Sequence, residues 1–279
     1  MMDAMASPTP PELTSAANPR VKAARALRDR RERDRTGLTL IDGARELRRA
    51  LDAGVTIEEA FVCEPLLAGP DARAALDGLL RAAVPVHRVS ERVLATFAFG
   101  ERAEGLVAVT GIPSTSLGDL SLPTEPLVVV IEGVEKPGNV GAVLRSADGA
   151  GADAVVAASP RTDLFNPNAI RASAGTIWAV ALASAPTPTV IDWLRAHGIR
   201  IVAARVEGLR PYTEVDLTGP LALVLGAEAD GLTDAWTAPD VETVSLPMLG
   251  VADSLNVSVT AGVLLYEARR QRGSAERGA

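Results

Sequence analysis

LVVVIEGVEKPGNVGAVLRSADGAGADAVVAAS, residues 127–159, begins and ends with an apolar run, and a glycine-bearing turn and a helical stretch lie between the two. The runs 127–131 and 154–157 are apolar on both faces, which is typical of strands buried inside a parallel sheet. Similar runs follow at 199–203, 221–225 and 241–246. Strands that alternate with helices predict an α/β fold, with a parallel sheet covered by helices on both sides.

The front of the chain predicts a second, smaller α/β domain. A helix is expected at 21–35, opened by Asn18 and Pro19. After it we expect strands at 38–41, 59–63, 84–89 and 106–109, and helices at 44–53, 70–82 and 91–97. The predicted organisation is a disordered tail (1–12), the small domain (13–112), a linker rich in Ser, Thr, Pro and Gly (113–125), the larger domain (126–272) and a tail (273–279).

Composition narrows the class of protein. With 279 residues, 47% of them hydrophobic, the chain can bury a core in each of two domains. No apolar run reaches the roughly 18 to 20 residues of a membrane span, and the start lacks the layout of a signal peptide. We therefore expect a cytoplasmic protein with no membrane partner. Cys63, His87 and His197 are too few for a Cys/His metal site, so no metal is expected.

Charge is distributed unevenly. The net charge is −7, yet residues 20–49 hold eleven basic and five acidic residues. A solvated amphipathic helix with mixed charges would explain this pattern. An arginine-rich segment on an acidic protein also suits a phosphate backbone, because each neutralised phosphate releases counterions. Both interpretations stay open on charge alone.

Three glycine-bearing stretches lie where ligands of parallel sheets bind, beyond the carboxyl ends of strands. The first, 135–146, could present a helix N-terminus to an anion or could simply form a tight turn. It matches neither the P-loop nor the dinucleotide fingerprint. In the second, 223–232, Gly226 would let a ligand touch backbone. In the third, 245–259, Ser254 is a plausible N-cap for a helix to about residue 271, and Asn256 and Ser258 need polar partners.

Taken in this order, the three stretches resemble the three motifs of the SpoU (TrmH-like) RNA 2′-O-methyltransferases. Residues 14–22 (TSAANPRVK) and 40–46 (LIDGARE) resemble the family's amino-terminal RNA-substrate domain. The resemblance implies a catalytic domain with a carboxyl-terminal trefoil knot, S-adenosylmethionine as cofactor, and a homodimer whose subunits share the active site. The implied reaction is methylation of a ribose 2′-hydroxyl in a structured RNA.

The resemblance also assigns roles to positions of this sequence. The motif positions imply catalytic roles for Arg145, Asn139, Glu228, Ser254 and Asn256. They imply cofactor contacts at Ala203, Gly226, Leu246, Met248, Ser254 and Leu255, with 203–207 as a further wall. The basic front segment supplies the RNA-binding candidates Arg20, Lys22, Arg28, Arg30, Arg31 and Arg45.

The implied chemistry leaves the role of Arg145 open. Methyl transfer from a sulfonium is an in-line displacement, so alignment of donor and acceptor is the main demand. The hydroxyl must lose a proton, yet a guanidinium resists acting as a base. Arg145 is therefore either transiently neutral in a desolvated site or a charged group that stabilises the developing alkoxide and a nearby phosphate.

Several alternatives remain at this stage. Ribosomal RNA is the expected substrate, because the separate front domain resembles that of the rRNA-modifying members; transfer RNA is the alternative. A non-enzymatic RNA-binding protein and a nucleotide-dependent oxidoreductase are the rival classes. Many members have glycine where this chain has Ala229, and Gln-Gly where it has Glu104-Gly105, so neither the geometry of that turn nor the identity of the substrate transfers directly.

Overall fold

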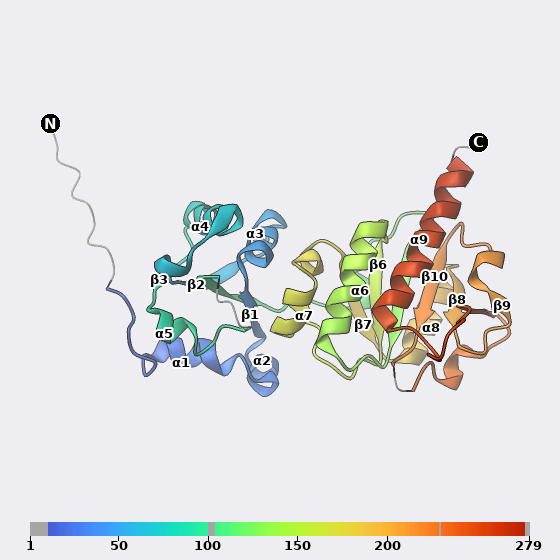
Figure 1. The fold of residues 1–279 in the computed structure, drawn as a ribbon, viewed down its shortest axis with the longest axis horizontal. Helices are drawn as coiled ribbons and strands as arrows, with labels where there is room; N and C mark the ends of the chain where they lie inside the picture. The colour runs from blue at the N-terminus through green and yellow to red at the C-terminus, as the bar shows by residue number, and fades with distance from the viewer. Residues whose placement is uncertain (1–10, 100–103, 229, 277–279) are drawn as a thin grey trace. The chain divides into compact units, whose positions relative to one another are not determined.

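The chain forms two compact units, divided between Ile112 and Pro113, in the computed structural model (Figure 1). The structure describes residues 11–99, 104–228 and 230–276. Most of the expected front tail, the last three residues of the expected end tail, and Ala229 therefore lie outside the described residues. Each unit has a sheet of its own.

The first unit is built on a mixed four-stranded sheet in the order β1-β4-β2-β3. β4 pairs antiparallel with both β1 and β2, whereas β2 and β3 run parallel. Phe61, Leu94 and Phe97 are buried in the core between this sheet and the helices. Its elements are α1 (Pro19–Ala26), α2 (Arg30–Thr36), β1 (Leu38–Asp42), α3 (Ala44–Asp52), β2 (Ile57–Val62), η1 (Glu64–Leu66), α4 (Gly69–Arg81), β3 (Val86–Arg88), α5 (Glu91–Leu94) and β4 (Leu106–Gly111).

The single helix predicted over 21–35 is wrong, because the chain breaks between α1 and α2. Asp29 caps α2 by accepting a hydrogen bond from the backbone N–H of Arg31, a role that favours a helix start over a helix interior. Arg33 is 1% exposed, and its guanidinium donates to the carbonyls of Leu27 and Arg28 at 2.7 and 2.9 Å. These bonds replace those lost at the break.

The second unit is built on a seven-stranded parallel sheet in the order β7-β6-β5-β10-β8-β11-β9, as the alternation of strands and helices predicts. Its elements are η2 (Leu117–Asp119), β5 (Leu127–Glu132), α6 (Pro137–Ala150), β6 (Ala154–Ala158), α7 (Pro167–Ala172), η3 (Thr176–Trp178), β7 (Ala181–Ala185), α8 (Thr187–Ala196), β8 (Arg200–Ala204), β9 (Arg210–Pro211), η4 (Tyr212–Glu214), β10 (Leu221–Leu225), η5 (Asp234–Trp236), β11 (Val241–Ser245) and α9 (Val257–Glu276).

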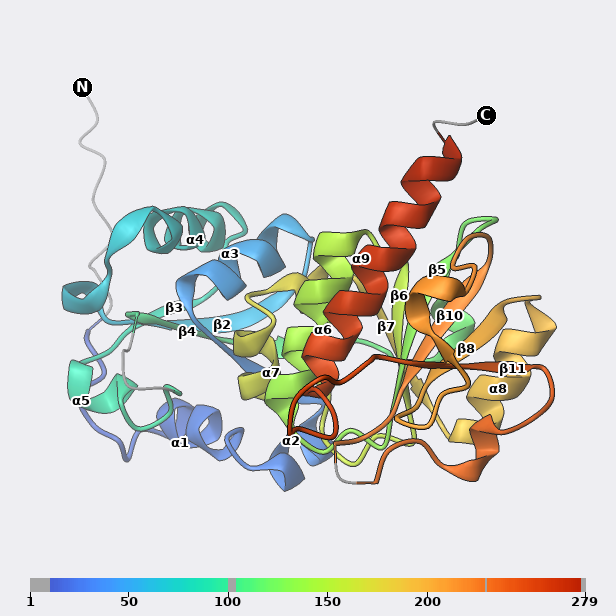
Figure 2. The ribbon, with the colours of Figure 1, turned by 45° about the vertical axis from the view of Figure 1, so that its right-hand side comes forward.

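The strands of this sheet are buried because helices cover both of its faces. Val128, Val156 and Val224 pack on one face with Leu194 of α8 and the fully buried Trp236. On the other face α6 and α9 lie side by side, and α7 packs against α6 (Figure 2). The carboxyl ends of the parallel strands consequently share one edge of the sheet, where their loops can meet.

Three expectations for the second unit need correction. The segment 113–125 is not a free linker, because Leu117 joins the core and the Thr115 hydroxyl lies 2.9 Å from that of Ser184 on β7. The tail expected at 273–279 begins too early, since α9 continues to Glu276. β11 is not buried on both faces, since Val244 is its only buried residue. β11 lies near the edge of the sheet, where only the two-residue strand β9 pairs with its outer side.

Gly141 on α6 sets how closely α6 and α7 approach. A β-carbon at this position would lie 2.4 Å from the carbonyl oxygen of Ala169 and 2.6 Å from the backbone nitrogen of Ser173. Both of those atoms are backbone, so no side chain can move aside. From the sequence alone, the glycines of this stretch were expected to present a helix N-terminus to an anion or to form a tight turn.

We expect Gly141→Ala to lower the free energy of unfolding by about 1 to 3 kcal/mol, because the added methyl forces α7 away. Gly138→Ala is the matched control on the same helix, since a β-carbon there meets nothing within 4 Å. Urea denaturation of both variants measures the difference. Equal stabilities would show that the α6–α7 approach tolerates a methyl group.

Candidate active site

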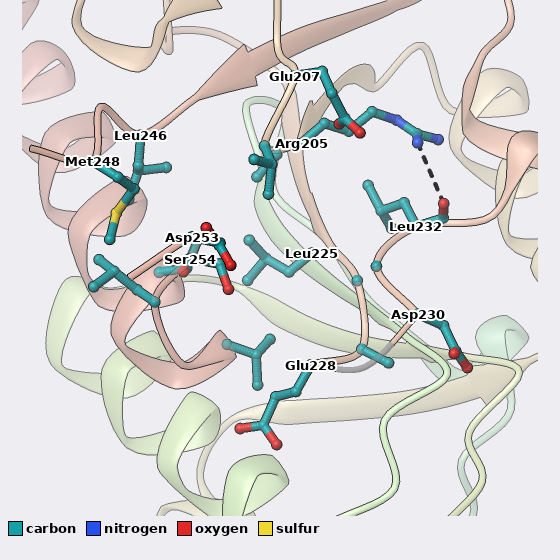
Figure 3. A pocket seen from close by; sticks show the side chains of 18 residues that line it. Arg205, Glu207, Leu225, Glu228, Asp230, Leu232, Leu246, Met248, Asp253 and Ser254 are labelled. Carbon is teal, nitrogen blue, oxygen red and sulfur yellow. Dashed lines mark hydrogen bonds between the residues drawn. The ribbon is translucent and has the colours of Figure 1, made fainter. Parts of the chain in front are cut away.

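A cavity of 340 Å³ opens where the loops after β8, β10 and β11 converge at the carboxyl edge of the sheet (Figure 3). Five of the six positions expected to contact a cofactor line it: Gly226, Leu246, Met248, Ser254 and Leu255. The sixth needs correction. Ala203 is fully buried in the core of the sheet, and the cavity is lined instead by Ala204 and the following residues to Glu207. Alternation along the strand turns the two alanines in opposite directions.

Gly226 is required by the turn itself, whether or not a ligand is present. A β-carbon on Gly226 would lie 2.2 Å from the carbonyl carbon of Gly231 and 2.4 Å from the backbone nitrogen of Leu232. The chain therefore folds back on itself directly after β10, and an isolated bridge pairs Ala227 with Gly231. The described residues of the resulting loop, 226–228 and 230–232, form one wall of the cavity and are called the wall loop below.

Glu228 on the wall loop joins the three motif stretches. Its carboxylate accepts hydrogen bonds from the Lys136 ammonium at 2.6 Å, from the Asn139 amide at 2.9 Å and from the Asn256 amide. Lys136 and Asn139 come from the stretch after β5, and Asn256 precedes α9. The Lys136 ammonium and the Asn139 amide hold the pKa of Glu228 below its ordinary value. Glu228 is accordingly an anionic anchor at neutral pH.

Asn256, and not Ser254, caps the last helix. The Asn256 side-chain oxygen accepts from the backbone N–H of Ser258 at 2.9 Å and from its hydroxyl at 2.6 Å, and α9 begins at Val257. Ser254 lies two residues earlier in the loop and lines the cavity. The expectation that Ser254 is the cap is therefore wrong. The polar side chains of Asn256 and Ser258 are hydrogen-bond partners of each other, and the Asn256 amide also donates to Glu228.

A smaller cavity of 220 Å³ adjoins the first and shares Ala227, Glu228 and Val257 with it. Lys136 and Asn139 line this second cavity. Lys136 was not among the expected site residues. The only signal in the sequence was that Lys136 lies two residues before Gly138 of the first motif. Lysines are common in exposed turns, so this position alone did not indicate a site residue. Asn139, by contrast, lies where the motif implies.

Arg145 does not line either cavity of its own chain. It lies on α6 with its side chain exposed, six residues beyond Asn139. Six residues on a helix correspond to a rotation of about 600°, so the two side chains project from different faces. Within one chain the structure brings together Asn139, Glu228, Ser254 and Asn256, and leaves Arg145 apart from them.

The basic residues of the front segment are exposed but partly engaged. Arg20, Arg30 and Arg45 form ion pairs with acidic residues at 3.1, 3.5 and 3.6 Å. The Arg28 guanidinium lies 4.4 Å from the centre of the Phe99 ring and donates to a carbonyl. The side chains of Lys22 and Arg31 are exposed. Exposed ion pairs are weak, so the ion pairs of Arg20, Arg30 and Arg45 would not prevent these side chains from contacting phosphates.

The first cavity has a mixed lining that suits a cationic organic ligand. Leu225, Leu246 and Met248 provide apolar surface, and Glu207 and Asp253 provide carboxylates. Among residues 11–99, 104–228 and 230–276, no group of three or more His, Cys, Asp or Glu could hold a metal ion. Within the same ranges no helix is long and apolar enough to cross a membrane.

Comparison with known proteins decides the family. Residues 126–266 match the model of the SpoU rRNA methylase family, half of the chain and the part that carries the two cavities. The chain belongs to the SpoU rRNA methylase family. Residues 18–108 match the MRM3-like substrate binding domain.

This SpoU family member has relatives that resemble it over nearly the whole chain. The 23S rRNA (guanosine(2553)-2′-O)-methyltransferase RlmP of Bacillus subtilis (strain 168) is 29% identical over 92% of this chain and 99% of its own. A solved RNA 2′-O ribose methyltransferase is 41% identical and covers 93% of this chain and 98% of its own, with a TM-score of 0.83. The SpoU methyltransferase AviRb from Streptomyces viridochromogenes, solved with AdoMet, is 31% identical to this chain. The match covers 92% of this chain and 99% of AviRb, with a TM-score of 0.81.

We expect the stabilising effect of Glu228 to disappear in acid. Its pKa is below the ordinary value of 4.5 in the folded protein, so its contribution is present above that value and is lost as the pH falls through the lowered pKa. Glu228→Gln should therefore lower the thermal midpoint at pH 7 and have a smaller effect at pH 3. Thermal unfolding of both proteins at the two pH values measures this. An equal difference at both would exclude an ionised anchor.

Proposed function

We propose that this chain transfers the methyl group of S-adenosylmethionine to a ribose 2′-hydroxyl of ribosomal RNA. The observation that carries the proposal is the convergence of the three motif stretches on Glu228 at the edge of a cavity with apolar and carboxylate lining. Two of the relatives named above are 2′-O-methyltransferases of RNA, and the third, a SpoU methyltransferase, was solved with AdoMet. Action on ribosomal RNA also supports a cytoplasmic location.

The first cavity would hold the cofactor. Leu246, Met248 and Leu255 would contact its adenosine, and the cavity's carboxylates suit the positive charge of its sulfonium. The cofactor supplies an electrophilic methyl group. The protein supplies alignment: Gly226 and the wall loop fix the donor, while Glu228 holds Asn139 and Asn256 beside the adjoining cavity, where the acceptor ribose would enter.

We further infer a homodimer in which Arg145 serves the cavity of the other subunit. Arg145 is exposed and outside the lining of its own chain's cavities. Exposed apolar side chains gather on the loop before α9 and on α9 itself: Leu249 (99%), Val251 (104%), Leu255 (39%), Val259 (50%) and Tyr266 (57%). Such a surface beside a site is typical of an interface. A charged Arg145 would then stabilise the developing alkoxide.

The first unit would bind the RNA that carries the target nucleotide. Its match to a substrate-binding domain and the exposed Lys22 and Arg31 support this role. In the second unit, α9 follows β11 in the chain and returns to pack against α6, which supports the expected trefoil knot. The alternative substrate, transfer RNA, is an outcome that the experiment below separates.

Ribose-methylation mapping of total RNA, with and without the gene, tests the proposal. We expect one nucleotide of ribosomal RNA to lose its 2′-O-methyl group when the gene is removed. Purified protein with S-adenosylmethionine should restore that mark on the unmodified RNA. Loss of a 2′-O-methyl group from transfer RNA instead would show that transfer RNA is the substrate. Ribose methylation that is unchanged in cells and absent in vitro would reject the proposed activity.

We expect Arg145→Lys to lower kcat about 100-fold or more, because lysine keeps the charge but loses the planar fork of donors. The affinity for S-adenosylmethionine, measured by calorimetry, should change by less than about twofold, since the proposed role of Arg145 is to stabilise the developing alkoxide and not to hold the cofactor. Methylation by this variant at the wild-type rate would remove Arg145 from the mechanism.

Mixed dimers test whether the site is shared. Arg145→Lys is combined with Ala204→Trp, whose bulk would fill the cofactor cavity. If Arg145 acts across the interface, the mixture should recover about a quarter of wild-type activity, because half of the dimers are mixed and each has one complete site. A mixture as inactive as its two components would place Arg145 in the site of its own chain.

A further inference from the structure

Glu132 is a buried carboxylate that the proposed reaction does not use. It ends β5 and is 3% exposed. Its Oε1 accepts from the Thr187 hydroxyl at 2.7 Å and from the Thr233 hydroxyl at 2.9 Å, and its Oε2 accepts from the backbone N–H of Thr233 at 2.8 Å. A buried carboxylate is costly unless several donors satisfy it, and here three neutral donors do so.

Thr233 directly follows the wall loop and is held from two sides. Its N–H and its hydroxyl both donate to Glu132. Its carbonyl accepts from the Arg205 guanidinium at 2.7 Å, and the neighbouring carbonyl of Leu232 accepts from the same group at 3.3 Å (Figure 3). Arg205 follows β8, and its own N–H donates to Val244 on β11 at 2.9 Å. Three strands therefore fix the end of one loop.

The hydrogen bonds around Glu132, Thr233 and Arg205 form a network that continues, on the other side of Glu132, to α8. Thr187 begins that helix, and its hydroxyl donates to Glu132, so the Ser159 hydroxyl, 3.0 Å away, must be the donor in their contact. The backbone N–H of Thr187 in turn donates to the Ser159 oxygen at 3.0 Å. Ser159 follows β6 and has a positive φ of 45°, a strained conformation for serine. The network thus connects the ends of β6, β5 and β8 with the wall loop.

We infer that Glu132, Thr233 and Arg205 are positioning residues that set the shape of the cofactor cavity. The inference rests on the proposed binding of S-adenosylmethionine in that cavity. The wall loop contributes Gly226, Glu228 and Leu232 to the lining, and its exit is determined by where Thr233 is held. Loss of one hydrogen bond to Glu132 would let the loop sample other positions, so fewer molecules would present a formed cavity.

The test compares two replacements of Thr233. Thr233→Val keeps the shape and the N–H but removes the hydroxyl donor, whereas Thr233→Ser keeps both donors. The matched control is Thr237→Val, because the Thr237 hydroxyl donates at 2.6 Å to the carbonyl of Asp234, outside the network. Both positions of change, Thr233 and Thr237, are exposed, so folding of the full chain should survive all three substitutions.

Calorimetry should give a Kd for S-adenosylmethionine roughly tenfold higher in Thr233→Val than in the wild type. Thr233→Ser and Thr237→Val should bind within about twofold of the wild type. At saturating cofactor, kcat of Thr233→Val should return to within about twofold, because the groups that contact the acceptor are unchanged. A Kd equal to that of the wild type in Thr233→Val would overturn the inference.

Amide hydrogen exchange tests the network without any cofactor. In Thr233→Val the amides of the wall loop should exchange roughly tenfold faster, while those of β5 and β10 should not change. Acceleration throughout the sheet, or none in the loop, would overturn the positioning role. If the wild-type protein shows no binding of S-adenosylmethionine, the proposed function fails, and the exchange of the wall loop still decides whether the network holds it.

Discussion

The carboxylate of Glu228 is the contact on which the site depends. Two segments that are far from Glu228 in the sequence end on its two oxygens, one through Lys136 and Asn139 and the other through Asn256. An ionised carboxylate only accepts hydrogen bonds, so it can hold several donors at once in a way that an amide cannot. The lowered pKa of Glu228 keeps it in that state at neutral pH. Without this anion the donors would have no common partner.

A second carboxylate, that of Glu132, also holds two segments together by accepting their hydrogen bonds. Glu132 receives donors from the end of the wall loop and the start of α8, as Glu228 receives them from α6 and the segment before α9. Both lie at carboxyl ends of central parallel strands, where short loops cannot satisfy all their own polar groups. The cavity beside Glu228 is therefore formed by loops that side chains hold in position, and large apolar residues complete the lining.

The two units of the chain carry different features. The second unit carries the cavities and the apolar surface around α9. The first unit carries the basic segment, in which Arg33 is buried and maintains the break between α1 and α2. An arginine-rich sequence thus combines structural and solvent-facing residues, and only burial separates them. The second unit matches the SpoU rRNA methylase family, and the first matches the MRM3-like substrate binding domain.

The sequence by itself determined the parallel sheet, because strands such as 127–131 are apolar on both faces, and it determined the three motif stretches through their order. It missed β7, whose alanine-rich residues have low strand propensity and pair only because β6 lies beside them. It also predicted Ser254 as the cap of the last helix, whereas Asn256 caps it, because either residue type can cap a helix. Only the tertiary structure decided which donors meet Glu228 and Glu132 and that Arg145 lies outside the lining of its own chain's cavities. Such contacts depend on where packed elements place side chains from distant segments.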